Sequence, residues 1–303
     1  MQKGANVAIV VVGSANVDTV IRGDRLPLPG ETVEASDYVE LPGGKGLNQA
    51  VAASRAGTDT AFFFATGNDS GGDMLRLFLS NESLTVHGVA DTAATGRAFI
   101  QINAAGENSI MIVGGANTTV TSWPTQNIFD AIQGASFLVL QQEVATELNL
   151  SLATHAKKTG TPVVLTPAPI EKTHPDLLAL VDILVLNEHE NAWLDRNESL
   201  SAAAKELKKT RTVIVTLGKQ GAMFFHDGKE HPVVPSPTVT AVDTTGAGDC
   251  FSGFLVASLD GGAPLAEAIH TACVAAAVSV TRNGAAVSMP TGSEVNHYRK
   301  DHL

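Results

Sequence analysis

The chain has 303 residues, a length typical of one large domain or two small ones. Its formal net charge of -11 argues against a surface that binds nucleic acid or an anionic membrane. Binding of a small phosphate-bearing molecule is still compatible with this charge, because local loops and Mg²⁺ hold phosphates. The two cysteines, Cys250 and Cys273, are too few for a metal cluster, and they fit a reducing cytoplasm. No segment approaches the roughly 18 apolar residues of a membrane span.

Strand patterns in the first third of the chain do not alternate with helices. A β-branched run at 7–12 predicts a buried first strand rather than a leader segment. The further strand patterns are 19–22, 32–41, and the hairpin pair 97–103 and 109–113. We expect them to form a small antiparallel sheet, inserted from about 14–42 and 95–115 into a single 1–303 domain. Such a sheet closes over a ligand as a lid, or it pairs with a second copy, because its strand edges would otherwise be exposed.

From residue 124 onward, short buried strands alternate with helices. The predicted strands are 136–141, 162–166, 182–186 and 212–216. The predicted helices are 145–158, 188–195, 199–209, 248–260 and 264–281. This alternation is typical of a mostly parallel sheet that is covered by helices on both faces.

A glycine-rich loop near the C-terminus carries the clearest chemical signal. A strand pattern ends near Val242, and a helix begins near Asp249. Between them, Gly246 and Gly248 lack a Cβ, so an anion can approach their N–H groups and those of the helix start. The Asp249 carboxylate beside these donors can accept the proton of an attacking hydroxyl during phosphoryl transfer. The alternative is a turn in which Asp249 serves only as a helix N-terminal charge.

A second glycine-rich segment, 42–50, begins another helix. Lys45 and Asn48 add polar groups to it, but no hydroxyl residue follows Lys45, so the P-loop pattern is absent. No GxGxxG follows the first strand, which argues against a dinucleotide-dependent oxidoreductase. Asn16 and Asp18 share one face of an extended segment. They suit recognition of vicinal hydroxyls, or they form an Asx turn.

The two glycine-rich segments resemble the two signatures of the ribokinase family of carbohydrate kinases, also called the PfkB family. The signatures correspond to 43–50 and 243–249, and the match is collinear over nearly the whole chain. The likeness is strongest to members that phosphorylate D-ribose, through the segments 13–18, 29–32, 114–117, 167–169 and 281–285. The resemblance implies a ribokinase-like α/β fold with a central, mostly parallel sheet sandwiched by helices and a small lid. It also implies ATP-dependent phosphorylation of O5 of D-ribose.

The resemblance implies a role for each matching residue. Asp249 is expected to be the catalytic base. The anion hole is expected at Gly246, Ala247 and Gly248. The sugar pocket is expected at Asn16, Asp18, Gly44, Lys45, Asn48 and Glu143. The nucleotide site is expected at Thr216, Leu217, Gly218, Lys219, Gln220, Gly221, Gly248 and Cys273.

Two metal ions are implied in the same way. Asn187 and Glu190 are expected to lie near Mg²⁺ and the phosphates, with water completing the coordination. A monovalent cation, K⁺, is expected beside the anion hole, surrounded by Asp243, Thr245, Ser279, Arg282, Gly284 and Ser288. The alternative for Arg282 and Ser288 is a cap at the C-terminus of a helix.

Three positions depart from the family pattern: Leu47, Thr166 and Cys273 stand where Ala, Asn, and His or Asn are common. None of them belongs to the phosphoryl-transfer residues. The alternatives within the family are kinases of deoxyribose, fructose, 2-keto-3-deoxygluconate or a nucleoside. The alternative from another class is a metabolite-binding protein without turnover. A homodimer through the lid sheet is expected.

Overall fold

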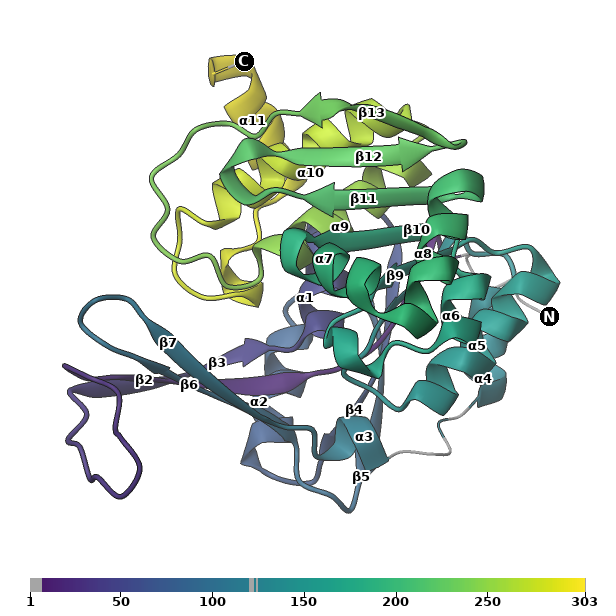
Figure 1. Cartoon of the computed structure of the whole chain (residues 1–303). Coiled ribbons are helices and arrows are strands. Elements are labelled where there is room, and N and C mark those ends of the chain that lie inside the picture. The colour runs from purple at the N-terminus through teal and green to yellow at the C-terminus, as the bar shows by residue number, and fades with distance from the viewer. Residues whose placement is uncertain (1–6, 120–122, 124, 303) are drawn as a thin grey trace.

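The computed structural model describes residues 7–119, 123 and 125–302. Within these residues it has a nine-stranded sheet and a four-stranded sheet (Figure 1). Both predicted lid segments lie in the smaller sheet, and residues 1–6, 120–122, 124 and 303 of the predicted domain lie outside the described residues. No helix in the described ranges is long and apolar enough to cross a membrane.

The larger sheet has the strand order β13-β12-β11-β10-β9-β8-β1-β4-β5. Its strands from β11 to β5 pair in parallel, whereas β12 and β13 form an antiparallel edge. The bounds are β1 (Ile9–Val12), β4 (Thr60–Gly67), β5 (Thr85–Asp91), β8 (Phe137–Gln141), β9 (Val163–Thr166), β10 (Ile183–Asn187), β11 (Thr212–Thr216), β12 (Ala222–His226) and β13 (Lys229–Val234). The central strands are buried along their length because helices cover both faces.

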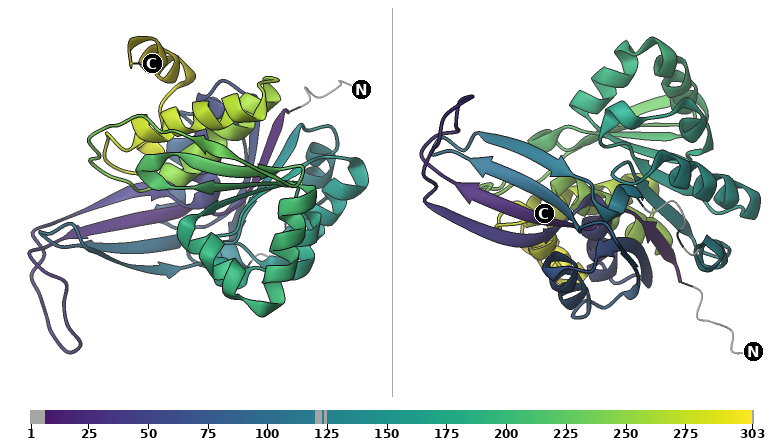
Figure 2. Two further views of the ribbon diagram at one scale, coloured as in Figure 1. Left: turned by 45° about the horizontal axis from the view of Figure 1, so that its top comes forward. Right: turned by 90° about the horizontal axis from the view of Figure 1, so that it is seen from below.

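One group of helices covers each face of this sheet (Figure 2). The first group, α1 (Lys45–Arg55), α9 (Ala247–Asp260) and α10 (Leu265–Ser279), packs together. The second group comprises α4 (Thr125–Ile132), α5 (Thr146–Thr159), α6 (Pro175–Leu180), α7 (Glu188–Arg196) and α8 (Glu198–Thr210). The remaining helices are α2 (Ser70–Leu79), α3 (Ala116–Thr119) and α11 (Gly292–His302). Together the layers form the sandwiched α/β body that the sequence predicts.

The smaller sheet extends away from this body as the lid (Figures 1 and 2). Its order is β3-β2-β6-β7, with bounds β2 (Asn16–Arg22), β3 (Asp37–Gly43), β6 (Gly96–Ile102) and β7 (Asn108–Val113). The pairs β2–β3 and β6–β7 are antiparallel, while β2 and β6 run parallel. β2 and β3 lead into the body at Asn16 and Gly43, so the lid is joined directly to the segment predicted to form the sugar pocket.

Most predicted elements are confirmed to within two residues, and the strand predicted at 212–216 matches β11. The strand predicted at 32–41 is wrong for its first part, because β3 begins at Asp37. Its pairing with β2 ends at Arg22, and the Ser36 N–H closes the ladder by donating to Arg22 O at 2.8 Å. The strand predicted to end near Val242 is also wrong. The Val242 N–H donates to Val280 O at 2.7 Å, so this segment is bound to the end of α10 instead of to the sheet.

Candidate active site

The two glycine-rich segments meet where α1 and α9 begin. A cavity of about 180 Å³ there is lined by residues from both segments, among them Lys45, Glu190 and Asp249. A neighbouring cavity of about 320 Å³ is lined by residues between β11 and α9, by the start of α9 and by the last turns of α10. The two cavities share the wall formed by Thr216, Thr244, Ala247 and Gly248. The space therefore has two compartments with the predicted anion hole between them.

Asp249 lies in the first turn of α9, between amides and a lysine. Asp249 is 6% exposed, and its two carboxylate oxygens accept hydrogen bonds from Asn48 Nδ2 and Gln49 Nε2, each at 2.9 Å. Burial raises the pKa of Asp249, and the nearby Lys45 and the two amides oppose this effect. A buried carboxylate held in this way is suited to accept a proton from a hydroxyl in the cavity.

Lys45 is the first residue of α1 and faces several carboxylates. Burial would lower the pKa of its ammonium group, but the charges of Asp249, Glu143, Glu190 and Asp18 outweigh burial and raise this pKa. The cluster therefore holds a lysine that stays protonated at neutral pH. Such a fixed positive charge is suited to an anionic group in this cavity.

Asp18 and Asn16 lie on one face of β2, as the sequence predicts. Burial raises the pKa of Asp18 from 3.8 to about 7, with further contributions from Glu143 and Asp249. Asn16 is 2% exposed, and its Oδ1 accepts a hydrogen bond from Asn117 Nδ2 at 2.8 Å. The strand interpretation is therefore confirmed over the Asx turn.

Glu143 and Gly44 complete the predicted sugar side. Glu143 Oε2 accepts from Ser14 Oγ at 2.5 Å and from the backbone N–H of Lys45 at 3.1 Å. Gly44 precedes α1 with a φ of 93°, and a Cβ there would lie 2.8 Å from Asn16 N. Only glycine allows β2 and the start of α1 to approach this closely. The structure therefore brings the six predicted sugar residues into one region beside Asp249.

The predicted anion hole lies at the start of α9. Gly246 has a φ of 75°, which turns the chain into the helix. The Ala247 N–H donates to Thr244 O at 3.3 Å, a long hydrogen bond. A Cβ on Gly248 would meet nothing within 4 Å, so this position faces open space. The first N–H groups of α9 thus border the cavity wall, as an anion hole requires.

The larger cavity holds most of the predicted nucleotide residues. Thr216, Gly218, Lys219, Gly221, Gly248 and Cys273 line it. Leu217 packs against the hydrophobic core instead, and the 3-10 turn Gly218–Gln220 carries Gln220 outside this lining. Burial raises the pKa of the Cys273 thiol to about 12, so this side chain is a neutral, apolar part of the cavity floor.

Asn187 and Glu190 form a capping box at the start of α7. Asn187 Oδ1 accepts the Glu190 N–H at 2.8 Å, and Glu190 Oε2 accepts the Asn187 N–H at 2.9 Å. Burial raises the pKa of Glu190. Both residues also line the smaller cavity, so the capping box lies in the wall of the candidate site.

The predicted cation residues surround the turn that follows α10. Asp243 accepts the backbone N–H groups of Thr245 and Gly284, each at 2.9 Å. Burial alone would raise its pKa, but these donors lower it. Ser279 and Ser288 are 1% exposed and donate to Ala276 O and Ala285 O, each at 2.8 Å. The Arg282 guanidinium is itself positively charged and pairs with Glu294, so the only oxygen that Arg282 offers to a cation is its backbone carbonyl.

Four residues of this region were not predicted: Ser14, Gln49, Asn117 and Gln141. Ser14 and Asn117 hold Glu143 and Asn16. Gln49 lies within the glycine-rich segment 42–50, directly after Asn48, and this adjacency was the available signal. Gln141 ends a predicted strand, and nothing in the local sequence marks it.

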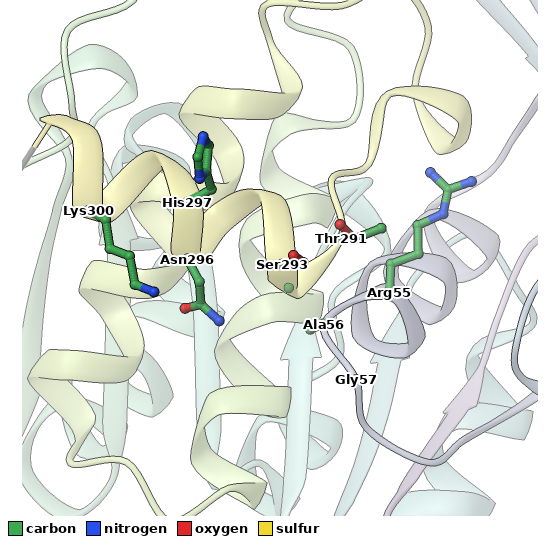
Figure 3. A pocket seen from close by; sticks show the side chains of 9 residues that line it. Arg55, Ala56, Gly57, Thr291, Ser293, Asn296, His297 and Lys300 are labelled. Carbon is green, nitrogen blue, oxygen red and sulfur yellow. The ribbon is translucent and has the colours of Figure 1, made fainter.

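A separate hollow of about 570 Å³ opens between the end of α1 and α11 (Figure 3). Asn296, His297 and Lys300 line it from α11. The Arg55 guanidinium points away from them, donating to Met289 O at 2.7 Å and pairing with Glu82 at 2.5 Å. The hollow lies at the opposite end of α1 from Lys45, so it is not part of the candidate site.

Comparison with known proteins shows to which family the chain belongs. The family model of the pfkB family carbohydrate kinases matches residues 7–292. The chain is similar to the ribokinase of Staphylococcus aureus, with 36% identity over 95% of this chain and 98% of that protein. It is also similar to the ribokinase of Haemophilus influenzae, with 37% identity over 94% and 96%. The chain therefore belongs to the pfkB family of carbohydrate kinases.

Solved structures agree with this membership. The ribokinase of Thermotoga maritima superposes with a TM-score of 0.88 at 33% identity, over 97% of this chain and 100% of the other. The ribokinase of Arabidopsis thaliana complexed with ribose and ATP superposes with a TM-score of 0.85 at 32% identity, over 97% and 98%. The fold predicted from the sequence is thereby confirmed, and the protein is an ATP-dependent sugar kinase.

Proposed function

We propose that the protein transfers the γ-phosphate of ATP to O5 of D-ribose, giving D-ribose 5-phosphate and ADP. The observation that carries this proposal is the pairing of a buried carboxylate, Asp249, with the open amide-lined start of α9 between two cavities. The near-full-length similarity to ribokinases supports D-ribose as the acceptor.

In the proposed reaction, Asp249 accepts the proton of the sugar hydroxyl as its oxygen attacks the γ-phosphorus. The new O–P bond forms while the bond from the γ-phosphorus to the bridging oxygen of ADP breaks, and ADP leaves with that electron pair. The N–H groups of Gly246, Ala247 and Gly248 stabilise the charge on the transferring phosphoryl group. Asn16, Asp18, Gly44, Lys45, Asn48 and Glu143 hold the sugar.

We propose Mg²⁺ and K⁺ as the metal ions. No group of three or more metal-binding side chains occurs in the part of the chain that the structure describes, which suits Mg²⁺ held through ATP phosphates and water near Asn187 and Glu190. Asp243 and the carbonyls of the 279–288 turn offer the oxygen donors that suit K⁺. When bound, both ions supply positive charge near the phosphates.

The variant Asp249→Asn tests the proposed base. Asparagine has the same shape as aspartate, and its single oxygen can keep one of the two contacts, with Gln49 or with Asn48. It lacks the carboxylate that accepts the proton. We expect folding and ATP binding to persist and turnover with D-ribose to fall by at least roughly 10³-fold. Turnover close to that of the wild type would refute the base assignment.

A second candidate acceptor is another polyhydroxy sugar. The departure at Leu47 lies beside the predicted sugar residues, where a larger apolar side chain changes packing. ADP release should be measured with D-ribose, deoxyribose, fructose, 2-keto-3-deoxygluconate and a nucleoside, with K⁺ present or replaced by Na⁺. A preference for another acceptor would reject D-ribose, and a complete lack of ADP release would favour a binding protein.

We further propose that the protein is a homodimer paired through one face of the lid. By strand register, Val20, Ile100 and Ile110 lie side by side on the face that also carries Asp18. Ile110 and Ile112 on this face are 54% and 51% exposed. The opposite face carries the Arg97–Glu40 ion pair together with the exposed side chains of Tyr38, Met111 and Val113. A second copy on the apolar face would cover the sugar side of the site.

The dimer proposal is tested by Ile110→Lys, with Met111→Lys on the opposite face as the control. We expect Ile110→Lys to sediment as a monomer at micromolar concentration, whereas Met111→Lys and the wild type sediment as dimers. A monomeric wild type would reject the pairing. We also propose a cytoplasmic location, supported by the two buried, unpaired cysteines.

A further inference from the structure

Gln49 and Gln141 form a buried chain of side-chain amides behind Asp249. Gln49 lies in α1 and Gln141 ends β8, and both residues are 0% exposed. Gln49 Nε2 donates to Asp249 Oδ1 at 2.9 Å, and Gln141 Nε2 donates to Gln49 Oε1 at 2.7 Å. These two hydrogen bonds therefore connect the Asp249 carboxylate of α9 to the central sheet.

The ionised carboxylate determines the donor and acceptor of each hydrogen bond between these amides. An ionised carboxylate only accepts hydrogen bonds, so Gln49 must turn its NH₂ group toward Asp249. Its Oε1 then faces Gln141, which must present its own NH₂ group. Gly13 leaves the space for this arrangement, because a Cβ at that position would overlap Gln141 Oε1. The backbone of Gln141 is held in turn, since its carbonyl accepts from Asn149 Nδ2 at 2.6 Å.

Gln49 and Asn48 together hold both oxygens of the carboxylate. Asn48 Nδ2 donates to Asp249 Oδ2 at 2.9 Å, so each oxygen receives one amide N–H group. The remaining lone pairs are then available to a sugar hydroxyl. Rotation of a carboxylate about its last torsion is otherwise soft. Loss of Gln49 would leave one oxygen unheld and the orientation of the base undefined.

We propose that Gln49 is a positioning residue for phosphoryl transfer and that Gln141 acts behind it. Gln49 fixes the rotation of the Asp249 carboxylate, and Gln141 fixes the amide of Gln49. Both glutamine side chains are fully buried behind Asp249, so neither is expected to touch a ligand. The inference rests on the proposed role of Asp249 as the base.

The test uses Gln49→Met and Gln141→Met, which keep approximate volume and remove the amides. A hydrogen bond to a charged group is lost in the first variant, so we expect kcat to fall roughly 10- to 100-fold. For Gln141→Met we expect a fall of about 3- to 10-fold, because the Gln49 amide is loosened but retained. The KM values for D-ribose and ATP should stay within about twofold in both. The double variant should match Gln49→Met, since the two residues act in series.

The matched control is Gln142→Met. Gln142 is the chain neighbour of Gln141 and is 2% exposed, but its Nε2 donates to Thr173 Oγ1 at 2.7 Å, away from Asp249. It should lose stability in urea unfolding as Gln141→Met does, and keep the kcat of the wild type. A similar kcat loss in the control would reduce the effect to general packing and overturn the inference.

The remaining outcomes separate this inference from the proposed base. An inactive Asp249→Asn together with a fully active Gln49→Met would reject positioning and keep the base. Activity in both variants would reject the base itself. A higher KM with unchanged kcat in Gln49→Met would make Gln49 a binding residue and also overturn the inference. If Gln49→Met does not fold, the comparison of Gln141→Met with Gln142→Met decides.

Discussion

The close contact between Gly43 and Asp18 allows a specific test of the sugar side. An ideal Cβ added to Gly43 would lie within 2.5 Å of all three atoms of the Asp18 carboxyl group. Gly43 does not have a positive φ, so alanine is compatible with its backbone. The carboxyl group is the free end of a side chain and must therefore move, by roughly 1–1.5 Å, to restore van der Waals distance. Gly43→Ala thus displaces Asp18 without removing it.

We expect Gly43→Ala to weaken sugar recognition and to leave the nucleotide side intact. A hydrogen bond between a carboxylate and a sugar hydroxyl contributes about 2 kcal/mol, so kcat/KM for D-ribose should fall roughly 30-fold, mainly through KM. The assay is coupled ADP release with D-ribose varied at saturating ATP, together with calorimetric titration of a non-hydrolysable ATP analogue. The affinity for this analogue should not change.

The control is Gly23→Ala, next to β2, where the nearest atom to an added Cβ is at 3.6 Å. This variant should keep the kinetics of the wild type. An unchanged KM for D-ribose in Gly43→Ala would refute the reasoning, because it would mean that the position of Asp18 does not matter for the sugar. A large loss of stability would show that the backbone, rather than the carboxyl group, had moved.

Three further predictions concern charge. Folding raises the pKa of the Asp18 carboxyl group from 3.8 to about 7, so the folded protein binds this proton more tightly than the unfolded chain and loses stability as pH rises through that range. Asp18→Asn removes this group and should therefore be more stable than the wild type at pH 8, by up to roughly 4 kcal/mol in urea unfolding. At pH 4 the variant should show no gain in stability. Arg55→Met should lose about 2–3 kcal/mol of unfolding free energy, because it leaves Glu82 and the carbonyl of Met289 unpaired. Arg25→Met removes an exposed ion pair and should lose less than about 1 kcal/mol. Equal losses in the two variants would contradict the stronger role of the partly buried ion pair. In Asp243→Asn, the K⁺ concentration for half-maximal turnover should rise at least about 10-fold at constant ionic strength, and an unchanged K⁺ response would place the cation elsewhere.

The fold and the proposed base could be predicted from the sequence because both are encoded by residues that are neighbours along the chain. The strands of the parallel sheet are short, buried runs, and the helices between them have their own pattern, so 212–216 and 248–260 were predicted closely. The segment 243–249 is contiguous, so its glycines and its carboxylate can be interpreted together. The errors at 32–36 and Val242 arose where hydrogen bonds to distant segments, not local residue preference, determine whether an extended chain joins a sheet.

The sequence by itself determined the α/β class, the lid segments and the two glycine-rich loops, because each depends on neighbouring residues. Only the tertiary structure decided which side chains donate hydrogen bonds to the Asp249 carboxylate. Gln49 contacts Asp249 across 200 positions of the chain, and Glu143 contacts Ser14 across 129. These contacts follow from how β8, α1 and α9 pack around buried polar groups, each of which must find a hydrogen-bond partner. No local pattern specifies that choice, since it depends on which element lies next to which in the folded core.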